Sequence, residues 1–468
     1  MDFRAVTVEE LGEGVRSGTL TAVGLAEAAL RRIDSLDQDI NAFVALDAGR
    51  SLAEAARVDE MVAAGEAVGP LAGVPVAVKD VTDVAGWVTT HGSVAHADDP
   101  PAPDDAVIVA RLRAAGAVVI GKTNSPEHGW TSDTTNELFG PTRNPWDLTR
   151  SPGGSSGGSA AALAAGMVPL ATGSDGGGSI RIPSAVCGLS GFKPTLGRVP
   201  NAGPVAAGWG MLSTSGPMAR RIRDVAYALD AVVGPHRHDP WSWPVVDGPW
   251  APTLEDPGLP ARIAWSPDLG YGPVDDAVRA TCVEAVATLS AAGCEVVEVE
   301  GPFAEDPLPP WLVLASTFLL RSLLPYRGTE MWERITPGLR DEIEWADNNL
   351  DATDFVLAID AAHEASVALA ECLTMAGAEV LLSPTVAGFA PPVGGTGTIN
   401  GKEDPNWVRF TYPFNLTRSP AGTVCAGLVD GLPVGLQVVG MPGDDLAVLR
   451  TLAGLEDLLA CDELAPVS

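Results

Sequence analysis

The first part of the chain has its apolar residues at helical spacing. An apolar stripe runs along residues 23–33, formed by Val23, Ala26, Leu30 and Ile33. Thr7 and Glu10 form a capping-box pattern, which is typical of a helix start. We therefore predict that residues 1–65 form a helical amino-terminal part.

The pattern changes after residue 70. Residues 71–78 form a short apolar run, rich in β-branched side chains, which ends at Lys79 and Asp80. Such a run predicts a buried strand, and its carboxyl end would present Lys79.

Helix and strand patterns then alternate. Predicted helices over 104–115, 275–292 and 353–377 lead into predicted strands over 117–120, 295–300 and 379–382. Near the carboxyl end, 428–431 and 434–439 indicate two antiparallel strands. This rhythm predicts an α/β fold in which a mixed β-sheet is covered by helices on both faces.

No linker or internal repeat divides the chain, so we predict one large domain over residues 1–468. Within it, residues 69–233 form the core that holds the glycine-rich motifs. The segments 234–260 and 387–415 are expected to be variable loops near the substrate entrance, because loops carry substrate gates more often than regular elements do.

Composition narrows the possible partners. The net charge of −31 argues against nucleic-acid binding, which needs clustered basic residues. The longest uncharged stretch, residues 151–174, is broken by glycine and proline and is too polar to span a membrane. The amino terminus does not have the pattern of a secretory signal, and the six cysteines form no CxxC pair. We expect a cytoplasmic protein with free thiols and no membrane partner.

Lysine is rare, with four residues (79, 122, 193 and 402) among the 29 basic side chains. An ammonium group can lose its proton near neutral pH and a guanidinium cannot, so a retained lysine is a candidate base.

The most informative stretch is residues 151–200, where two glycine- and serine-rich loops flank an alanine-rich helical run. Three kinds of chemistry compete for it. A phosphate-binding loop is disfavoured because neither loop contains the lysine of the GxxxxGK motif. An α/β-hydrolase is disfavoured because no strand pattern precedes the G-x-S-x-G match at Ser155. The third is a serine nucleophile that a lysine activates, beside a glycine loop whose N–H groups hold an oxyanion.

The motifs of the third interpretation resemble those of the amidase signature family over most of the chain. They include 69–80, 121–127, 142–146, 153–159, 173–183, 191–194 and 431–437. The spacing between Ser155 and Ser179 is also similar to the family's.

The resemblance implies a Ser–cisSer–Lys set, with Ser179 as the acylated nucleophile and Ser155, after a cis peptide, as the bridge to Lys79. It implies an oxyanion hole made by the N–H groups of Gly176, Gly177, Gly178 and Ser179, and a loop braced by Asp175 and Arg181. Lys79 would need a pKa well below its usual value of about 10.4, which burial can supply.

The triple glycine at 176–178 is similar to that of relatives which act on arylamides, nylon oligomers and carbamates. The predicted function is hydrolysis of a non-peptide amide of the aryl, oligoamide or carbamate (urethane) type through an acyl-enzyme on Ser179. The main alternative is the glutaminase A subunit of a tRNA-dependent amidotransferase. Those subunits typically have glutamine where this chain has Ile182, and the acidic charge fits tRNA poorly.

A non-catalytic binding protein is disfavoured because both serines and the lysine are present. We expect no cofactor and no metal, since His236 and His238 lie in a polar loop without a third ligand. A small-molecule amide or carbamate is the expected partner, and a homodimer is mildly favoured. Five aromatic residues lie in segments near these motifs but are not assigned to the pocket, namely Trp130, Phe139, Trp209, Phe410 and Phe414.

Overall fold

The fold is taken from a computed structural model, which describes residues 1–202, 209–245 and 247–467. Parts of the predicted segments 69–233 and 234–260 therefore lie outside the described residues. Within the described ranges, the strands form one sheet of 11 strands and a separate pair, β10 (Thr398–Ile399) and β11 (Lys402–Glu403).

The large sheet is mixed, as predicted. Its order is β1-β3-β2-β4-β6-β5-β12-β13-β9-β7-β8. The bounds of these strands in chain order are β1 Phe43–Leu46, β2 Pro75–Lys79, β3 Val118–Thr123, β4 Leu170–Asp175, β5 Ser190–Lys193, β6 Thr214–Ala219, β7 Arg262–Trp265, β8 Glu295–Glu298, β9 Leu381–Pro384, β12 Ala421–Val429 and β13 Leu432–Val439. Strand β2 is parallel to β3 and β4, whereas β12 is antiparallel to β5 and β13.

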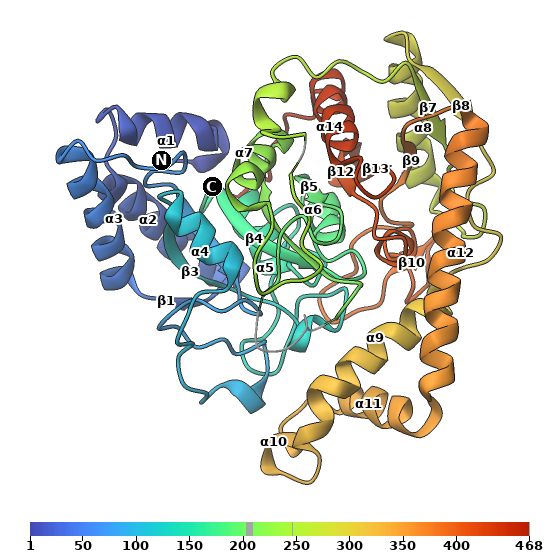
Figure 1. The fold of residues 1–468 in the computed structure, drawn as a ribbon, viewed down its shortest axis with the longest axis horizontal. Coiled ribbons are helices and arrows are strands. Elements are labelled where there is room, and N and C mark those ends of the chain that lie inside the picture. Colours follow the sequence, from blue (N-terminus) through green and yellow to red (C-terminus); the bar gives the residue numbers. More distant parts are fainter. Residues whose placement is uncertain (203–208, 246, 468) are drawn as a thin grey trace.

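Helices cover both faces of this sheet (Figure 1). Two glycines, one on β12 and one on β13, show which helix lies on each face of the sheet. A side chain at Gly435 would meet Ala185 of α6 (Arg181–Val186), whereas one at Gly422 would meet Leu452 of α14 (Asp445–Leu459). Gly422 pairs with Val438, three residues from Gly435, so the two helices lie on opposite faces because side chains alternate along a strand.

The predicted amino-terminal helices are present as α1 (Val8–Arg16), α2 (Ala22–Ile40) and α3 (Ala48–Ala63). Thr7 and Glu10 form both hydrogen bonds of the capping box at α1. The prediction of an all-helical segment was wrong at one place, because β1 lies between α2 and α3. This four-residue strand pairs antiparallel with β3 at the edge of the sheet.

The remaining predicted elements are present with shifted ends. They are α4 (Val107–Ala114) with β3, α8 (Asp276–Ala291) with β8, and α12 (Ala352–Ala376) with β9. The predicted antiparallel pair near the carboxyl end is β12 with β13, but the predicted strand over 428–431 was wrong at its end, because residues 430–431 form the turn between them. Strand β2 begins at Pro75, later than predicted, because Gly73 adopts a positive φ of 70° in a turn that precedes it. Lys79 is still the last residue of the strand.

A helical lobe projects beside the sheet (Figure 1). It contains α9 (Leu308–Leu323), α10 (Glu330–Glu333) and α11 (Pro337–Asn349), and α9 packs against α11 and the long α12. By length and composition alone, the stretch Leu308–Tyr326 could cross a membrane. One such helix is weak evidence for a membrane span, because core helices of other proteins pass the same test. The remaining described helices are α5 (Gly157–Ala164), α7 (Ile222–Val232) and α13 (Pro413–Leu416).

Candidate active site

Lys79 lies at the carboxyl end of β2, in the interior of the molecule. Its side chain is 0% exposed, and its Nζ donates to Ser155 Oγ at 2.7 Å and to Ser174 Oγ at 3.0 Å. Burial lowers the pKa of Lys79 to about 7, although the nearby negative charge of Asp175 acts in the opposite direction. A pKa in this range allows the amine to lose its proton near neutral pH, and the amine is hydrogen-bonded to a serine hydroxyl.

A different lysine pairs with Asp80. Lys122 Nζ lies 2.8 Å from Asp80 Oδ1, and both side chains are buried. Lys79 therefore is not the ion-pair partner of the aspartate that follows it, and its amine is directed to the two serines.

Ser155 precedes α5, and its peptide bond with Gly154 is cis. Glycine is required at 154 because a Cβ there would lie 2.9–3.0 Å from backbone atoms of Ser132 and Asp133. The close packing of this loop holds the Ser155 hydroxyl next to Lys79.

Ser179 is half-buried at the end of the triple-glycine loop. The two serine loops touch through the backbone, since Ser156 N–H donates to the Ser179 carbonyl at 3.2 Å. Among the described residues, no hydrogen bond joins the Ser179 hydroxyl to Ser155. The structure thus brings Lys79 and Ser155 together directly and places Ser179 on the adjoining loop.

The peptide groups of the glycine loop are held through their carbonyl oxygens. Three side chains donate to them: Asn415 Nδ2 to Asp175 O at 2.9 Å, Trp311 Nε1 to Gly176 O at 2.9 Å, and Thr411 Oγ1 to Gly177 O at 2.6 Å. The backbone N–H of Ile182 donates to Gly178 O at 2.7 Å. In a trans peptide the N–H points away from the C=O, so these contacts also fix where the N–H groups point.

Not all four predicted oxyanion donors are available. The Gly178 N–H donates to Asp175 Oδ1 at 2.8 Å. Within the described ranges, the N–H groups of Gly176, Gly177 and Ser179 have no protein acceptor. These three donors fit an oxyanion site, because a reacting oxygen would be their first partner.

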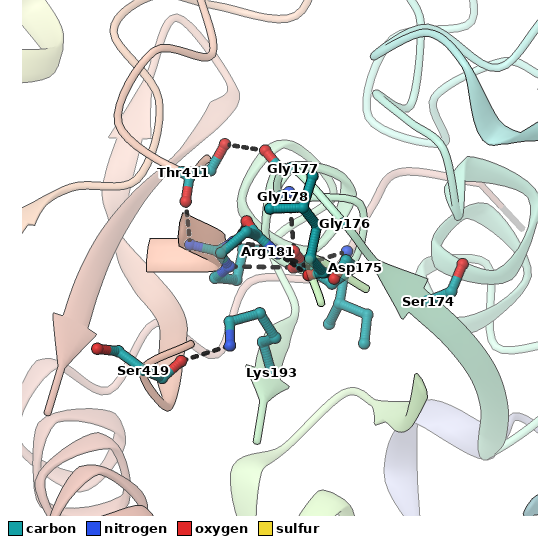
Figure 2. A network of polar contacts seen from close by, with 12 residues as sticks. Ser174, Asp175, Gly176, Gly177, Gly178, Arg181, Lys193, Thr411 and Ser419 are labelled. Carbon is teal, nitrogen blue, oxygen red and sulfur yellow. Dashed lines mark hydrogen bonds and ion pairs between the residues drawn. The ribbon is translucent and has the colours of Figure 1, made fainter. Parts of the chain in front are cut away.

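Asp175 and Arg181 form a buried ion pair beneath the loop, with Nη2 and Oδ1 2.9 Å apart and both side chains fully buried (Figure 2). Burial alone would raise the pKa of Asp175, but the charge and hydrogen bonds of Arg181 hold it well below the usual range. Arg181 also donates to Thr411 O, Gln437 Oε1 and Asn415 Oδ1. This network ties the loop to α13 and β13.

Lys193 lies beside this network (Figure 2), where its Nζ donates to the Ser419 carbonyl. Burial, and then the positive charge of Arg181, lowers the pKa of Lys193 to about 7. Its Nζ donates to the backbone oxygens of Pro194 and Ser419. Among the described residues, it has no hydrogen bond with Ser155, Ser174 or Ser179.

Aromatic side chains occupy the space beside the glycines. A Cβ on Gly176 would lie 2.9 Å from the indole of Trp209, and one on Gly177 would lie 2.5 Å from the indole of Trp311. The rings of Trp209 and Trp311 are 5.8 Å apart. The glycines therefore make room for two indoles packed directly against the loop.

The family of the chain follows from comparison with known proteins. The sequence model of the Amidase family matches residues 24–449. The chain belongs to the amidase signature family. An acylamidase from Rhodococcus erythropolis is 37% identical, with 96% of this chain and 95% of the relative aligned. The glutamyl-tRNA(Gln) amidotransferase A subunit of Salinispora tropica is also 37% identical, with 98% of each aligned.

Solved amidase structures agree with the fold. A bacterial aryl acylamidase superposes with a TM-score of 0.90 at 30% identity, covering 97% of this chain and 96% of that one. A 6-aminohexanoate cyclic dimer hydrolase in complex with its substrate has a TM-score of 0.89 at 29% identity, covering all of both chains. The protein is therefore an amidase, as the motifs indicated.

Several residues of this amidase site were missed at the level of sequence. Ser174 is the second partner of Lys79, and it lies on β4 within the glycine–serine segment, where its place beside Asp175 was the available signal. Asn415, Thr411 and Trp311 come from distant segments that carry no motif.

Of the five unassigned aromatic residues, Trp209 lies against the loop. Phe410 and Phe414 are fully buried in the core, Phe139 is half-buried, and Trp130 donates through Nε1 to Glu342 of α11.

The predicted loop 234–260 lines a cavity of about 840 Å³ together with α12. Its walls include Trp241, Trp243 and Arg418. Lys79, Ser155 and Ser179 do not line this cavity. Within the described part of the chain, no group of three His, Cys, Asp or Glu side chains could hold a metal ion.

Proposed function

We propose that this amidase hydrolyses a non-peptide amide of the aryl, oligoamide or carbamate type through an acyl-enzyme on Ser179. The observation that carries the proposal is the contact of 2.7 Å between Ser155 Oγ and the Nζ of a fully buried lysine whose pKa is about 7. A base of this kind is needed because a serine hydroxyl is a weak nucleophile until its proton is removed.

In the first step, neutral Lys79 takes a proton from Ser155, and Ser155 takes the proton of Ser179 as the Ser179 oxygen attacks the substrate carbonyl. The oxygen of the tetrahedral intermediate accepts from the N–H groups of Gly177 and Ser179. Each donor of this kind is worth about 3–4 kcal/mol of barrier.

In the second step, the lysine ammonium returns its proton through Ser155 to the departing nitrogen, which must be protonated before the C–N bond breaks. Water then attacks the ester on Ser179 while the same relay removes a proton from that water. When the acyl–oxygen bond breaks, the lysine ammonium returns this proton through Ser155 to the departing Ser179 oxygen, which restores the serine hydroxyl and releases the acid. Lys79 ends each cycle neutral.

The surroundings of the loop support an apolar substrate. Trp209 and Trp311 pack on Gly176 and Gly177, so a substrate carbonyl bound there would lie close to aromatic faces. Relatives named acylamidase, aryl acylamidase and 6-aminohexanoate cyclic dimer hydrolase point in the same direction.

The glutaminase subunit stays the second candidate because relatives of that name are as similar in sequence as the acylamidase. Free glutamine is a small polar substrate and gains little from two indoles. A net charge of −31 also opposes work on tRNA.

The test is a panel of anilides, aliphatic amides, carbamates and free glutamine, assayed with the purified wild-type protein beside Ser179→Ala. We expect an anilide, oligoamide or carbamate to be cleaved, with no turnover by the variant. Cleavage of glutamine alone would support the amidotransferase alternative.

A further inference from the structure

Trp311 makes a polar contact with the oxyanion loop that the family motifs do not include. Its indole Nε1 donates to the carbonyl of Gly176 at 2.9 Å, and its ring lies where a side chain of Gly177 would be. The indole thus restrains one peptide group in two ways, by a hydrogen bond and by contact with the ring.

The restrained peptide is the one between Gly176 and Gly177. Its carbonyl belongs to Gly176 and its N–H to Gly177, and the two point in opposite directions across a planar trans bond. Glycine peptides rotate readily, since glycine has almost no steric preference in φ and ψ. A donor on the carbonyl is therefore what keeps the Gly177 N–H directed to the opposite side.

The position of Trp311 is itself fixed by contacts at the start of α9. Asp306 Oδ1 accepts from the N–H of Leu308, in the first turn of the helix. The same oxygen accepts from the hydroxyl of Tyr412 at 2.5 Å, and the Tyr412 ring lies 5.5 Å from that of Trp311. Asn406 Nδ2 donates to both Asp306 and the Tyr412 hydroxyl.

We propose that Trp311 is a positioning residue for catalysis, because its indole N–H holds the Gly176–Gly177 peptide in the orientation that directs the Gly177 N–H at the reacting oxygen. The inference rests on the proposed function. It adds a residue from the helical lobe to a site otherwise built from the sheet and its loops.

This role makes a kinetic prediction that a simple packing role does not. The oxygen becomes an anion only in the transition state, so loss of the restraint lowers kcat while ground-state binding is kept. Removing an oxyanion donor outright costs about 100- to 1,000-fold in kcat. A donor that is misdirected some of the time is expected to cost less, about 10- to 100-fold.

The experiment replaces Trp311 by 3-benzothienylalanine, in which sulfur takes the place of the indole N–H and the ring keeps its size. Trp311→Phe is the second variant, and Trp345→Phe, an exposed tryptophan on α11, is the matched control. Each protein is assayed on the best substrate of the panel, and each is titrated with an aryl trifluoromethyl ketone, to which Ser179 adds to form a tetrahedral oxyanion.

We expect the benzothienylalanine variant to lose about 10- to 100-fold in kcat, with KM within about twofold and a parallel loss of affinity for the ketone. Trp311→Phe should show the same loss in kcat together with a higher KM, because it also removes part of the ring surface beside the loop. The control should match the wild type. An unchanged kcat with benzothienylalanine, or a raised KM at constant kcat, would overturn the inference. Neither result affects the proposed function, which instead fails if Ser179→Ala retains turnover.

Discussion

The pH dependence of turnover tests the state of Lys79 directly. A lysine with its ordinary pKa of about 10.4 would be neutral in about one molecule in 2,500 at pH 7. Burial lowers the pKa of Lys79 to about 7, which makes about half of the molecules neutral at that pH. The structure therefore supplies about a thousandfold more of the active base than an exposed lysine would.

The expected profile follows from that value. The pH dependence of kcat/KM reports the ionisation of the free enzyme. We expect kcat/KM to rise tenfold per pH unit below about 6, to bend near pH 7, and to be level above about pH 8. At pH 5 it should be about 100-fold below the plateau, because about 1% of the lysine is neutral there.

The assay is kcat/KM for an anilide between pH 5 and 9, with wild type and Ser174→Ala. The Ser174 hydroxyl accepts from Nζ at 3.0 Å, which favours the ammonium, so its removal should shift the bend to lower pH. Lys193 also has a pKa of about 7 but does not contact Ser174, so this shift distinguishes the two lysines. A flat profile between pH 6 and 8, or a bend that Ser174→Ala does not lower, would refute the reasoning.

Three further predictions concern the loop and the relay. Arg181→Met leaves Asp175 as a buried charge without its ion-pair partner, and urea denaturation should show a loss of about 3–5 kcal/mol in unfolding free energy. A loss below about 1 kcal/mol would contradict the role of this ion pair in bracing the loop. Gly178→Ala places a Cβ 2.3 Å from Thr411 Oγ1 at a φ of 128°, and we expect kcat to fall at least about 100-fold because the loop must shift. Wild-type kinetics in this variant would contradict the requirement for a fixed loop. Lys79→Met should stabilise the inactive protein at pH 7 by up to about 4 kcal/mol, because the pKa of Lys79 is near 7 in the folded protein and higher in the unfolded chain, which therefore binds more protons. The gain in unfolding free energy should shrink as the pH rises towards about 10. A lower unfolding free energy than that of the wild type, measured in urea at about pH 7, would contradict this.

The regular helix–strand units of the fold could be predicted from the sequence. Long amphipathic helices followed by short apolar runs gave α8 with β8 and α12 with β9 nearly at their observed ends. The strands β4, β5 and β6 were not predicted, because glycine, serine and proline interrupt the β-branched pattern that marks a strand. They form because neighbouring strands on both sides supply their hydrogen bonds.

The residues of the site also fall into two groups, those that a sequence motif marks and those that only the fold brings to the loop. Lys79 and Ser155 lie in motifs, and their contact was expected from the family resemblance. Ser174 sits between the motif residues but was overlooked, whereas Trp311 and Asn415 reach the loop only through tertiary packing. A hydrogen bond to a backbone carbonyl leaves no pattern in a single sequence, since many side chains can donate it.

The most direct test of the account is to identify the covalent intermediate. The protein is mixed with an activated anilide or p-nitrophenyl ester of the preferred acid, quenched in acid within milliseconds, digested and analysed by mass spectrometry. The account predicts an acyl group on the peptide that contains Ser179, present in wild type and absent from Ser179→Ala. An acyl group on Ser155, or turnover of the anilide by Ser179→Ala, would contradict it.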